Sequence, residues 1–414
     1  MLTTILAGAL LLPSGLVMVA SFVTVAVLSW PGLALLCYRR PEAGSNTKTT
    51  AAASTQKRRR RRRAIITGGS SGIGLGTAIR CLEDGFDEVY ILARNPDKLE
   101  TARTELQAKA DESNSNCTIR AMSVDISQPE ALQAAAKTIF ETDNDGDDQD
   151  HAYFNILFCI AGATYPEHFA NLPATTFAKL VQTNQLGTIY TVQAFLPHLL
   201  QPQQQSCDSE GTIVLCSSMA GQVGTFGYTA YAPTKAALTA FAQALHMELA
   251  TFPLSVCVAY PPDTATPSFA VENETKPYEC QLISEDGGQP ADPQDIANII
   301  VRQAVLTNPP FSIYCNFDGW MLSNLTCGLS PVTGWGDVVT QVAGMGLFRL
   351  IGLFYHKEWI RMIRNYQTRS GSSSSNSSSS KKDDPKKDAN TRPQEPEKKG
   401  SDVTDKAESD QGKS

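Results

Sequence analysis

Three side chains in the middle of the chain have the types and spacing of a proton-transfer site. Tyr231 and Lys235 are four residues apart, so they share one face of a helix, and Ser218 lies thirteen residues before Tyr231. A phenol near pKa 10 is a poor acid at neutral pH, so we expect the ammonium of Lys235, together with the charge of a bound cofactor, to lower that pKa. Tyr231 would then protonate a carbonyl oxygen that Ser218 hydrogen-bonds. Tyr228 is a rival phenol, but no lysine lies four residues beyond it.

A glycine-rich turn lies far upstream, in the run Thr-Gly-Gly-Ser-Ser-Gly-Ile-Gly at residues 67–74. It follows a β-branched run and opens a helical one, the context in which backbone amides approach a pyrophosphate at a helix N-terminus. A purely structural turn is the alternative. If the turn binds a dinucleotide, the residues that we expect to contact it are Gly68, Ser70, Ser71, Gly72, Ile73 and Gly74.

The end of the second predicted strand indicates which nicotinamide nucleotide is used. An acidic side chain there would bond the adenosine ribose, but this sequence has Ala93 followed by Arg94. The guanidinium of Arg94 suits a 2′-phosphate, and Lys98 adds charge one helical turn later. Ser70 is a further candidate ligand of that phosphate. NADPH is therefore favoured over NADH, the alternative being that Arg94 is a solvated surface charge.

Short β-branched runs alternate with longer helical periods from Ala64 onward, which predicts an α/β fold with a doubly wound parallel sheet. Such a sheet brings its loops together at the carboxyl ends of the strands. The predicted strands are 64–67, 88–93, 118–125, 154–163, 211–218 and 254–262, and the predicted helices include 74–85, 97–110, 176–200 and 234–250.

The spacing Thr-Gly-x-x-x-Gly-x-Gly, together with Ser218, Tyr231 and Lys235, resembles the short-chain dehydrogenase/reductase family and its Rossmann-type fold. The resemblance implies that Asn184 completes a catalytic tetrad by holding a water that links the lysine to solvent. It implies that Asp125 contacts the adenine. The residues implied to contact the carboxamide and phosphates are Thr264 and Thr266. Family members also pair through their long helices, so a homo-oligomer is compatible with this sequence.

Two segments depart from the common family pattern. Cys159 begins a Cys-Ile-Ala-Gly run where many members have Asn-Asn-Ala-Gly, and Pro262 replaces a glycine after the sixth strand. Residues 259–284, 317–334 and 344–355 resemble instead the members that reduce a long-chain sphingoid ketone. That implies a step of sphingolipid synthesis at the cytosolic face of the endoplasmic reticulum. A retinoid, a steroid or a ketoacyl chain is the alternative substrate, and a nucleotide-sensing scaffold is the alternative outside enzymes.

Both ends of the chain carry membrane or tail signals. Residues 1–38 contain no charged side chain and are long enough for a transmembrane anchor. The basic linker that follows, residues 39–63, ends in six arginines and predicts that the domain at 64–310 faces the cytosol. Residues 311–366 form an apolar extension whose stretch 338–355 we expect to be interfacial or substrate-covering, with a second membrane crossing as the alternative. Residues 367–414 predict a disordered tail.

Charge and cysteine usage exclude other classes. The net charge of −7 does not suit a nucleic-acid partner, so the arginine run is better explained by topology and membrane lipid. The ten cysteines form no Cys-x-x-Cys pair, which argues against a disulfide framework or a metal site. An acidic run begins at Glu141, but Ala152 stands where a calcium loop needs a glutamate, so a solvated loop is expected.

Overall fold

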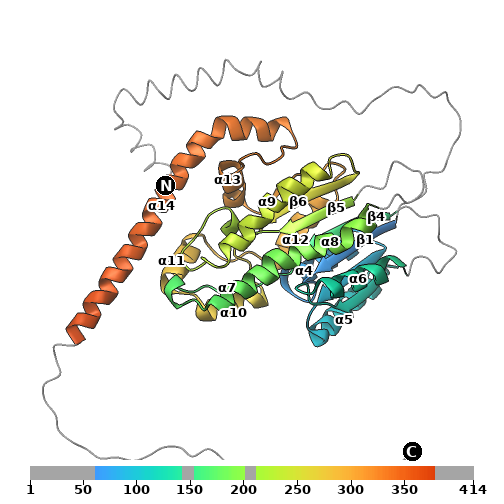
Figure 1. The fold of residues 1–414 in the computed structure, drawn as a ribbon, viewed down its shortest axis with the longest axis horizontal. Coiled ribbons are helices and arrows are strands. Elements are labelled where there is room, and N and C mark those ends of the chain that lie inside the picture. The colour runs from blue at the N-terminus through green and yellow to red at the C-terminus, as the bar shows by residue number, and fades with distance from the viewer. Residues whose placement is uncertain (1–60, 142–152, 201–210, 378–414) are drawn as a thin grey trace, which may run out of the picture. The chain divides into compact units, whose positions relative to one another are not determined.

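A computed structural model of the chain describes residues 61–141, 153–200 and 211–377, and its centre is a seven-stranded parallel sheet (Figure 1). The strand order β3-β2-β1-β4-β5-β6-β7 reverses direction beside β1, which is where open α/β sheets bind ligands. The predicted doubly wound sheet is confirmed. Its strands are β1 (Arg61–Thr67), β2 (Glu88–Ala93), β3 (Thr118–Ser123), β4 (Tyr153–Cys159), β5 (Gly211–Cys216), β6 (Leu254–Tyr260) and β7 (Ser312–Tyr314).

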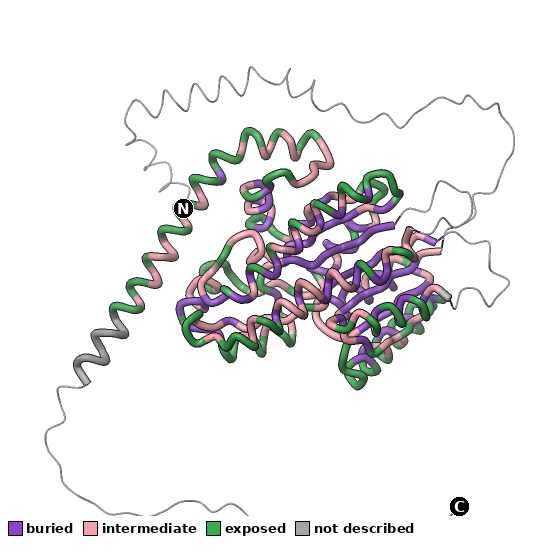
Figure 2. Tube along the Cα trace, viewed as in Figure 1, coloured by how far each residue is buried: buried purple, intermediate pink, exposed green. Residues whose placement is uncertain are grey.

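Successive side chains of each strand feed two cores, one on each face of the sheet. Ile65 packs in one core and Ile66 in the other, as the alternation of a strand requires. Figure 2 shows the buried residues gathered along the central strands. The first core is covered by α6 (Pro129–Glu141), α8 (Gly187–Leu199) and α9 (Ala232–Glu248). The second is covered by α4 (Gly72–Glu83), α5 (Pro96–Glu112) and α12 (Pro293–Ala304).

The first strand begins three residues earlier than predicted and includes the last arginines of the basic run. Arg63 is completely buried, and its Nε donates to Glu88 Oε2 at 2.7 Å across the β1–β2 pair. Its guanidinium also lies 4.2 Å from the ring centroid of Tyr153 on β4. The strand thus extends three residues into the predicted linker, because a buried partner makes this arginine part of the sheet.

The predicted long helix over residues 176–200 is helical throughout but is not one regular α-helix. It consists of α7 (Ala174–Leu180), a π-helical segment at Val181–Leu186 and then α8. A π-turn widens the backbone and often marks a functional site. Asn184 lies within this segment and is fully buried.

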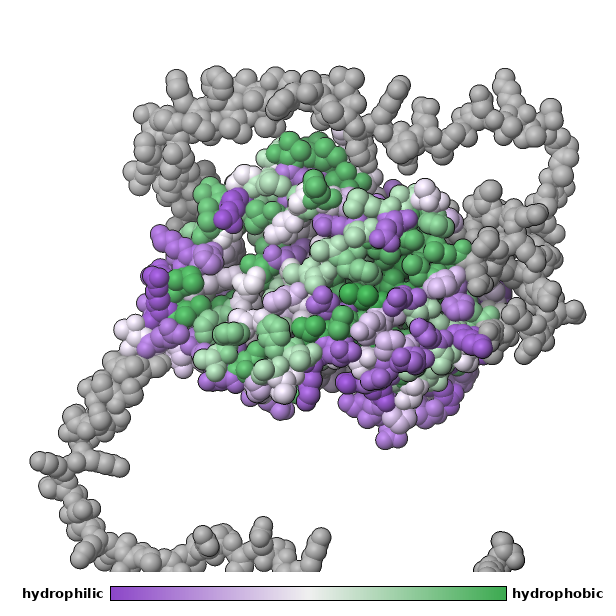
Figure 3. Space-filling model, viewed as in Figure 1, coloured by the Kyte–Doolittle hydropathy of each residue, from purple (hydrophilic) through white to green (hydrophobic). Residues whose placement is uncertain are grey.

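The chain leaves the sheet through α13 (Phe317–Leu325) and ends its described part in α14 (Trp335–Ser377). Within α14, Trp335–Thr368 is the one described helix long and apolar enough to cross a membrane, with a mean hydropathy of 1.5 and 6% of its most apolar window buried. Figure 3 shows hydrophobic surface over the first turns of this helix. The helix extends past both ends of the predicted stretch 338–355, and it passes Gln367, where the sequence predicts a disordered tail.

Several predicted segments lie outside the described residues: the anchor at 1–38, the linker up to residue 60, most of the acidic loop and the tail from residue 378. In the described ranges, the eight cysteines are all free thiols, and no group of His, Cys, Asp and Glu side chains is placed to hold a metal ion. Burial raises the pKa of Cys257 to about 12, so this thiol stays protonated and unreactive at neutral pH.

The buried ion pair of β1 and β2 predicts a stability effect that the arginine run alone does not. Arg63→Ala removes the close partner of the buried Glu88 carboxylate and leaves it only Arg61, at 3.7 Å, so it should lower the free energy of unfolding by up to about 3–5 kcal/mol. Denaturant unfolding of the detergent-solubilised protein measures this loss. Arg103→Ala breaks a solvent-exposed pair with Glu100 and should change stability far less. Equal effects of the two substitutions would contradict this role of Arg63.

Candidate active site

The carboxyl ends of the strands open into one cavity of about 1310 Å³. It is lined by the loops after β1, β2, β4, β5 and β6, and by residues of α13 and α14. All the predicted site residues except Asn184 and Asp125 line it. The fold thus brings together side chains that are more than 190 residues apart in the sequence, as expected at the carboxyl edge of a parallel sheet.

The glycine-rich turn forms one end of this cavity and is too close to its surroundings for larger residues. Gly68 and Gly72 have φ values of +75° and +54°, which side chains rarely adopt. A Cβ at Gly74 would lie 2.2 Å from the carbonyl oxygen of Gly68. Ser71 occupies the N-cap of α4 without using its side chain as a cap, so the first amides of α4 and this hydroxyl remain available to an anion.

The cationic side chains predicted to bind the 2′-phosphate of the nucleotide lie beside this turn. Arg94 follows β2, and both Arg94 and Lys98 are exposed and line the cavity. Asn95 caps α5 by accepting a hydrogen bond from the amide of Lys98 at 2.9 Å, which fixes the turn between the two cations. This cap is not among the residues predicted from the sequence.

Asp125 lies two residues past the end of β3, and its Oδ1 accepts hydrogen bonds from the amide and the hydroxyl of Ser127, at 2.9 Å and 2.8 Å. These bonds shape the turn into α6. Its neighbours Val124 and Ile126 line the cavity. The implied contact of Asp125 with an adenine stays a prediction.

Thr264 and Thr266 close the cavity from the segment after β6. Thr264 Oγ1 donates to the carbonyl oxygen of Pro262 at 2.8 Å. Thr266 caps α10 (Pro267–Thr275) by accepting from the amide of Phe269 at 3.1 Å, so its hydroxyl hydrogen remains free to donate to a phosphate. A Cβ at Gly72 would lie 2.8 Å from Thr266 Cγ2, so this threonine stands directly against the glycine-rich turn.

These features fit a nicotinamide dinucleotide. A positive-φ glycine turn at a helix N-terminus accommodates a pyrophosphate, and the cavity continues from there to the phenol of Tyr231. The residues that would hold the cofactor are Gly68, Ser70, Ser71, Gly72, Ile73, Gly74, Arg94, Lys98, Thr264 and Thr266, with Tyr231 and Lys235 at the reacting end.

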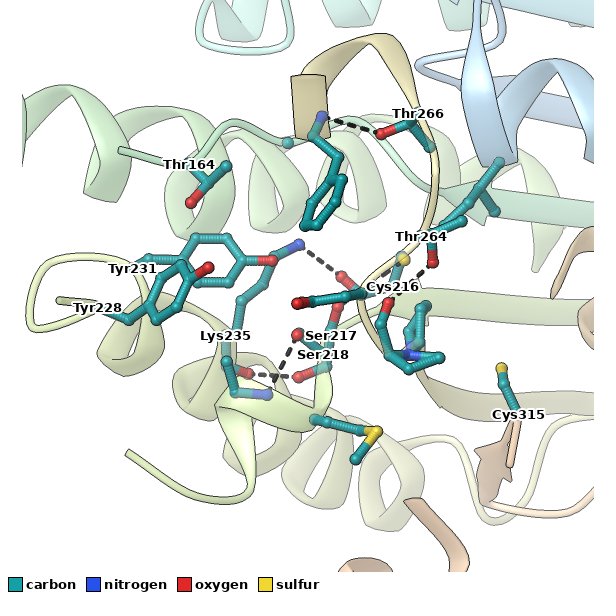
Figure 4. Close-up of a pocket in the computed structure, with 18 of the residues that line it drawn as sticks. Thr164, Cys216, Ser217, Ser218, Tyr228, Tyr231, Lys235, Thr264, Thr266 and Cys315 are labelled. Atoms are coloured by element: carbon teal, nitrogen blue, oxygen red, sulfur yellow. Dashed lines mark hydrogen bonds between the residues drawn. The ribbon is translucent and has the colours of Figure 1, made fainter. Parts of the chain in front are cut away.

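The proton-transfer group is held at the junction of β5 and α9. Tyr231 is the N-cap of α9, and Pro233 lies in its first turn, where the missing amide hydrogen costs little. Lys235 Nζ donates to the carbonyl oxygen of Cys216 at 2.7 Å, and Ser217 Oγ donates to the carbonyl oxygen of Lys235 at 2.8 Å. Figure 4 shows both bonds, with the Tyr231 ring over the same part of the cavity.

Asn184 supports this group from behind the cavity wall. Its Nδ2 donates to Thr234 Oγ1 at 3.1 Å and to the carbonyl oxygen of Ala163 at 2.8 Å, while its Oδ1 accepts from the Ala163 amide. A Cβ at Gly162 would lie 3.3 Å from both Asn184 Oδ1 and Lys235 Nζ. Asn184 is therefore next to the lysine, and Gly162 keeps the space between them open.

Burial governs the protonation of the two titrating groups. Desolvation raises the pKa of Tyr231, a hydrogen bond with Ser218 opposes that rise, and desolvation lowers the pKa of Lys235. The lowering of the phenol pKa that we expect from Lys235 together with a bound cofactor therefore stays a prediction. In the protein alone the phenol keeps its proton at neutral pH.

The rival phenol belongs to a network that the sequence analysis missed. Tyr228 donates a short hydrogen bond to Glu272, and burial raises the pKa of Tyr228 strongly. Its ring lies beside that of Tyr231, with 5.8 Å between centroids (Figure 4). Glu272 is 41 residues downstream of Tyr231, and no local sequence pattern connects the two.

The mouth of the cavity is bordered by α14. Its contributing residues include Arg349, Leu353 and Trp359, and Trp359 Nε1 donates to Asp286 Oδ2 at 3.2 Å. Phe348, on the same helix, packs edge-on against Trp320 of α13, with ring centroids 5.3 Å apart. The predicted substrate-covering position of this segment is consistent with these contacts.

The two departures from the family pattern have local explanations. Cys159 ends β4 in the core with its pKa raised by burial, while Thr67 braces the neighbouring loop by accepting from the amides of Ile160 and Ala161 at 3.1 Å and 3.3 Å. The carbonyl oxygen of Pro262 accepts a hydrogen bond from the hydroxyl of Thr264. Neither departure disturbs the proton-transfer group.

Comparison with known proteins agrees with this geometry. A short chain dehydrogenase family model matches residues 62–277. A 3-ketodihydrosphingosine reductase of Bos taurus is 39% identical over 302 residues, which cover 72% of this chain and 84% of that protein. A 3-dehydrosphinganine reductase of Danio rerio is 38% identical, with the same coverage.

A solved short-chain type dehydrogenase/reductase from Mycobacterium marinum shares the fold. The TM-score is 0.51 at 22% sequence identity, and the match covers 61% of this chain and 93% of that one. The sequence matches extend through the glycine-rich turn and the Tyr231 region that the sheet brings together. The chain belongs to the short-chain dehydrogenase family, whose members use nicotinamide nucleotides.

Proposed function

We propose that this protein reduces 3-ketodihydrosphingosine to dihydrosphingosine with NADPH, as a step of sphingolipid synthesis. The observation that carries the proposal is the 39% identity to a relative of that name over 84% of the relative's length. The cavity supports it, because a protonated phenol, a hydroxyl and a lysine converge at the carboxyl edge of the sheet. The site has the donors that a ketone oxygen needs at one end and room for a nucleotide at the other.

Each polar side chain of the site has a role in reducing the ketone. When bound, the nicotinamide nucleotide supplies the hydride that the carbonyl carbon receives. Tyr231 donates its phenolic proton to the carbonyl oxygen, and Ser218 stabilises the charge that develops there with a hydrogen bond. The ammonium of Lys235 stabilises the phenolate left behind, and Asn184 positions the segment beside it. One hydride and one proton convert the ketone to an alcohol.

Arg94 and Lys98 support NADPH as the nucleotide. Both line the cavity beside the glycine-rich turn, and Ala93 ends β2 where an acidic residue would repel a phosphate. A guanidinium binds phosphate through paired, charge-assisted hydrogen bonds. The 2′-phosphate would therefore lie at this cationic end of the cavity.

A membrane location suits a substrate with a long alkyl chain. The uncharged residues 1–38 would anchor the chain, and α14 presents Leu347, Leu350 and Phe354 as exposed apolar side chains beside the cavity mouth. An apolar chain transferred from lipid to such a helix avoids water. We place the protein in the endoplasmic reticulum membrane with its catalytic domain in the cytosol, following the basic run after the anchor.

The first test removes the proton donor. Tyr231→Phe should lower kcat for 3-ketodihydrosphingosine by about 10²- to 10⁴-fold, because only the phenolic hydroxyl is lost. NADPH oxidation by the detergent-solubilised protein measures this, and NADPH binding should persist. Tyr278→Phe, on the exposed surface of α11 (Tyr278–Asp286), serves as the matched control. Substantial turnover by Tyr231→Phe would refute the assigned role of the phenol.

A second test addresses the nucleotide. Arg94→Ala should lower kcat/KM for NADPH by about 10- to 100-fold, the effect of losing a hydrogen bond to a charged group, and should leave kcat/KM for NADH nearly unchanged. Arg103→Ala makes the same change of charge on the outer face of α5 and should have no such effect. If Arg94→Ala weakened both nucleotides equally, recognition of the 2′-phosphate by this side chain would be excluded.

A further inference from the structure

A second group of charged side chains lies beside the proton donor, on the segment that follows β6. Asp263 and Glu272 both line the cavity, and Glu272 accepts the hydroxyl hydrogen of Tyr228, whose ring stands 5.8 Å from that of Tyr231. The charge of both carboxylates also raises the pKa of Tyr231, in keeping with this placement. The proton-transfer chemistry derived above uses neither of them.

A buried lysine joins the two carboxylates. Lys276 Nζ lies 3.2 Å from Glu272 Oε1 and 4.0 Å from Asp263 Oδ2, and its side chain is 1% exposed. Lys276 Nζ also lies over the ring of Phe269, 4.4 Å from the ring centroid. Ser284 donates a short hydrogen bond to Asp263. Two carboxylates thus face one ammonium. An ion pair that only held α10 in place would need a single carboxylate.

The group leaves one charge poorly compensated. Lys276 Nζ pairs with Glu272 Oε1 at 3.2 Å, but it is 4.0 Å from Asp263 Oδ2. The Asp263 side chain is 44% exposed and lines the cavity, whereas the side chain of Lys276 is buried. A carboxylate that is partly withdrawn from water without a close cation is unfavourable. A ligand with a cationic group in the cavity would compensate this charge.

We propose that Asp263 and Glu272 bind the protonated amino group of the substrate. This inference rests on the proposed function. In a sphingoid ketone the amino group is on the carbon next to the carbonyl, so the ammonium is two bonds from the reacting carbon and must bind close to Tyr231. Glu272 is held there by Tyr228, whose ring lies beside that of Tyr231, and Asp263 lies 4.0 Å from the Lys276 ammonium that pairs with Glu272.

The arrangement also orients the two ligands of the cavity. The end beside the glycine-rich turn carries Arg94 and Lys98, and the end beside Tyr231 carries Asp263 and Glu272. A phosphate is attracted to the first end and repelled by the second, whereas an amine has the opposite preference. Asp263 and Glu272 are specificity-determining residues in this account, because they act on the binding of the ketone and take no part in the proton transfer.

The test compares 3-ketodihydrosphingosine with the same ketone lacking its amino group, using NADPH oxidation by the detergent-solubilised full chain. The unmodified protein should show at least about tenfold higher kcat/KM for the amino ketone, as expected for one charge-assisted contact. Asp263→Asn and Glu272→Gln should each lower kcat/KM for the amino ketone by about tenfold. Both should leave kcat/KM for the desamino ketone within about twofold of its original value, because they remove charge without removing the proton donor.

Glu274→Gln is the matched control, since Glu274 is exposed on the same helix and outside the cavity. It should keep the preference for the amino ketone.

Equal losses for the amino and desamino ketones in both carboxylate variants would overturn the recognition of the amine and indicate a structural role. If the unmodified protein reduced both ketones equally well, the inference would fail while the proposed function stood. If it reduced neither, the proposed function itself would fail.

Discussion

The hydrogen bond from Lys235 Nζ to the carbonyl oxygen of Cys216 ties the first turn of α9 to the end of β5, and the site is arranged around it. The return bond from Ser217 Oγ to the carbonyl oxygen of Lys235 fixes the same junction from the other side. Because β5 is a fully buried central strand, this junction cannot shift without disturbing the sheet. Ser218 and Tyr231 flank it, so their positions follow from the packing of the core.

Burial of this junction shifts the two titrating groups in opposite directions. Desolvation raises the pKa of Tyr231 and lowers that of Lys235, so in the absence of cofactor the phenol is protonated at neutral pH. The charge of Asp263 and Glu272 also raises the pKa of the phenol, so a cationic substrate that neutralises the two carboxylates would lower that pKa again and ease the release of the proton.

Local features of this site were predictable from the sequence, and long-range partnerships were not. The glycine-rich turn and the Tyr231–Lys235 pair depend on spacing within one turn or one helix, and both were identified. Arg63 looked like part of a solvated basic run, because its partner Glu88 is 25 residues away. The π-helical segment around Asn184 and the placement of Asp125 depend on packing, which periodicity does not encode. The same holds for the network of Glu272.

The most direct test of the account is the substrate itself. The full-length protein in detergent would be given NADPH with 3-ketodihydrosphingosine, a retinaldehyde or a ketosteroid, and the product would be identified along with the rate. Our account predicts that the sphingoid ketone is converted to dihydrosphingosine with one NADPH oxidised for each product formed, and that the other two carbonyl compounds react far more slowly. Preferred turnover of the retinaldehyde or the ketosteroid would contradict the substrate assignment while leaving the family and the Tyr231 site in place.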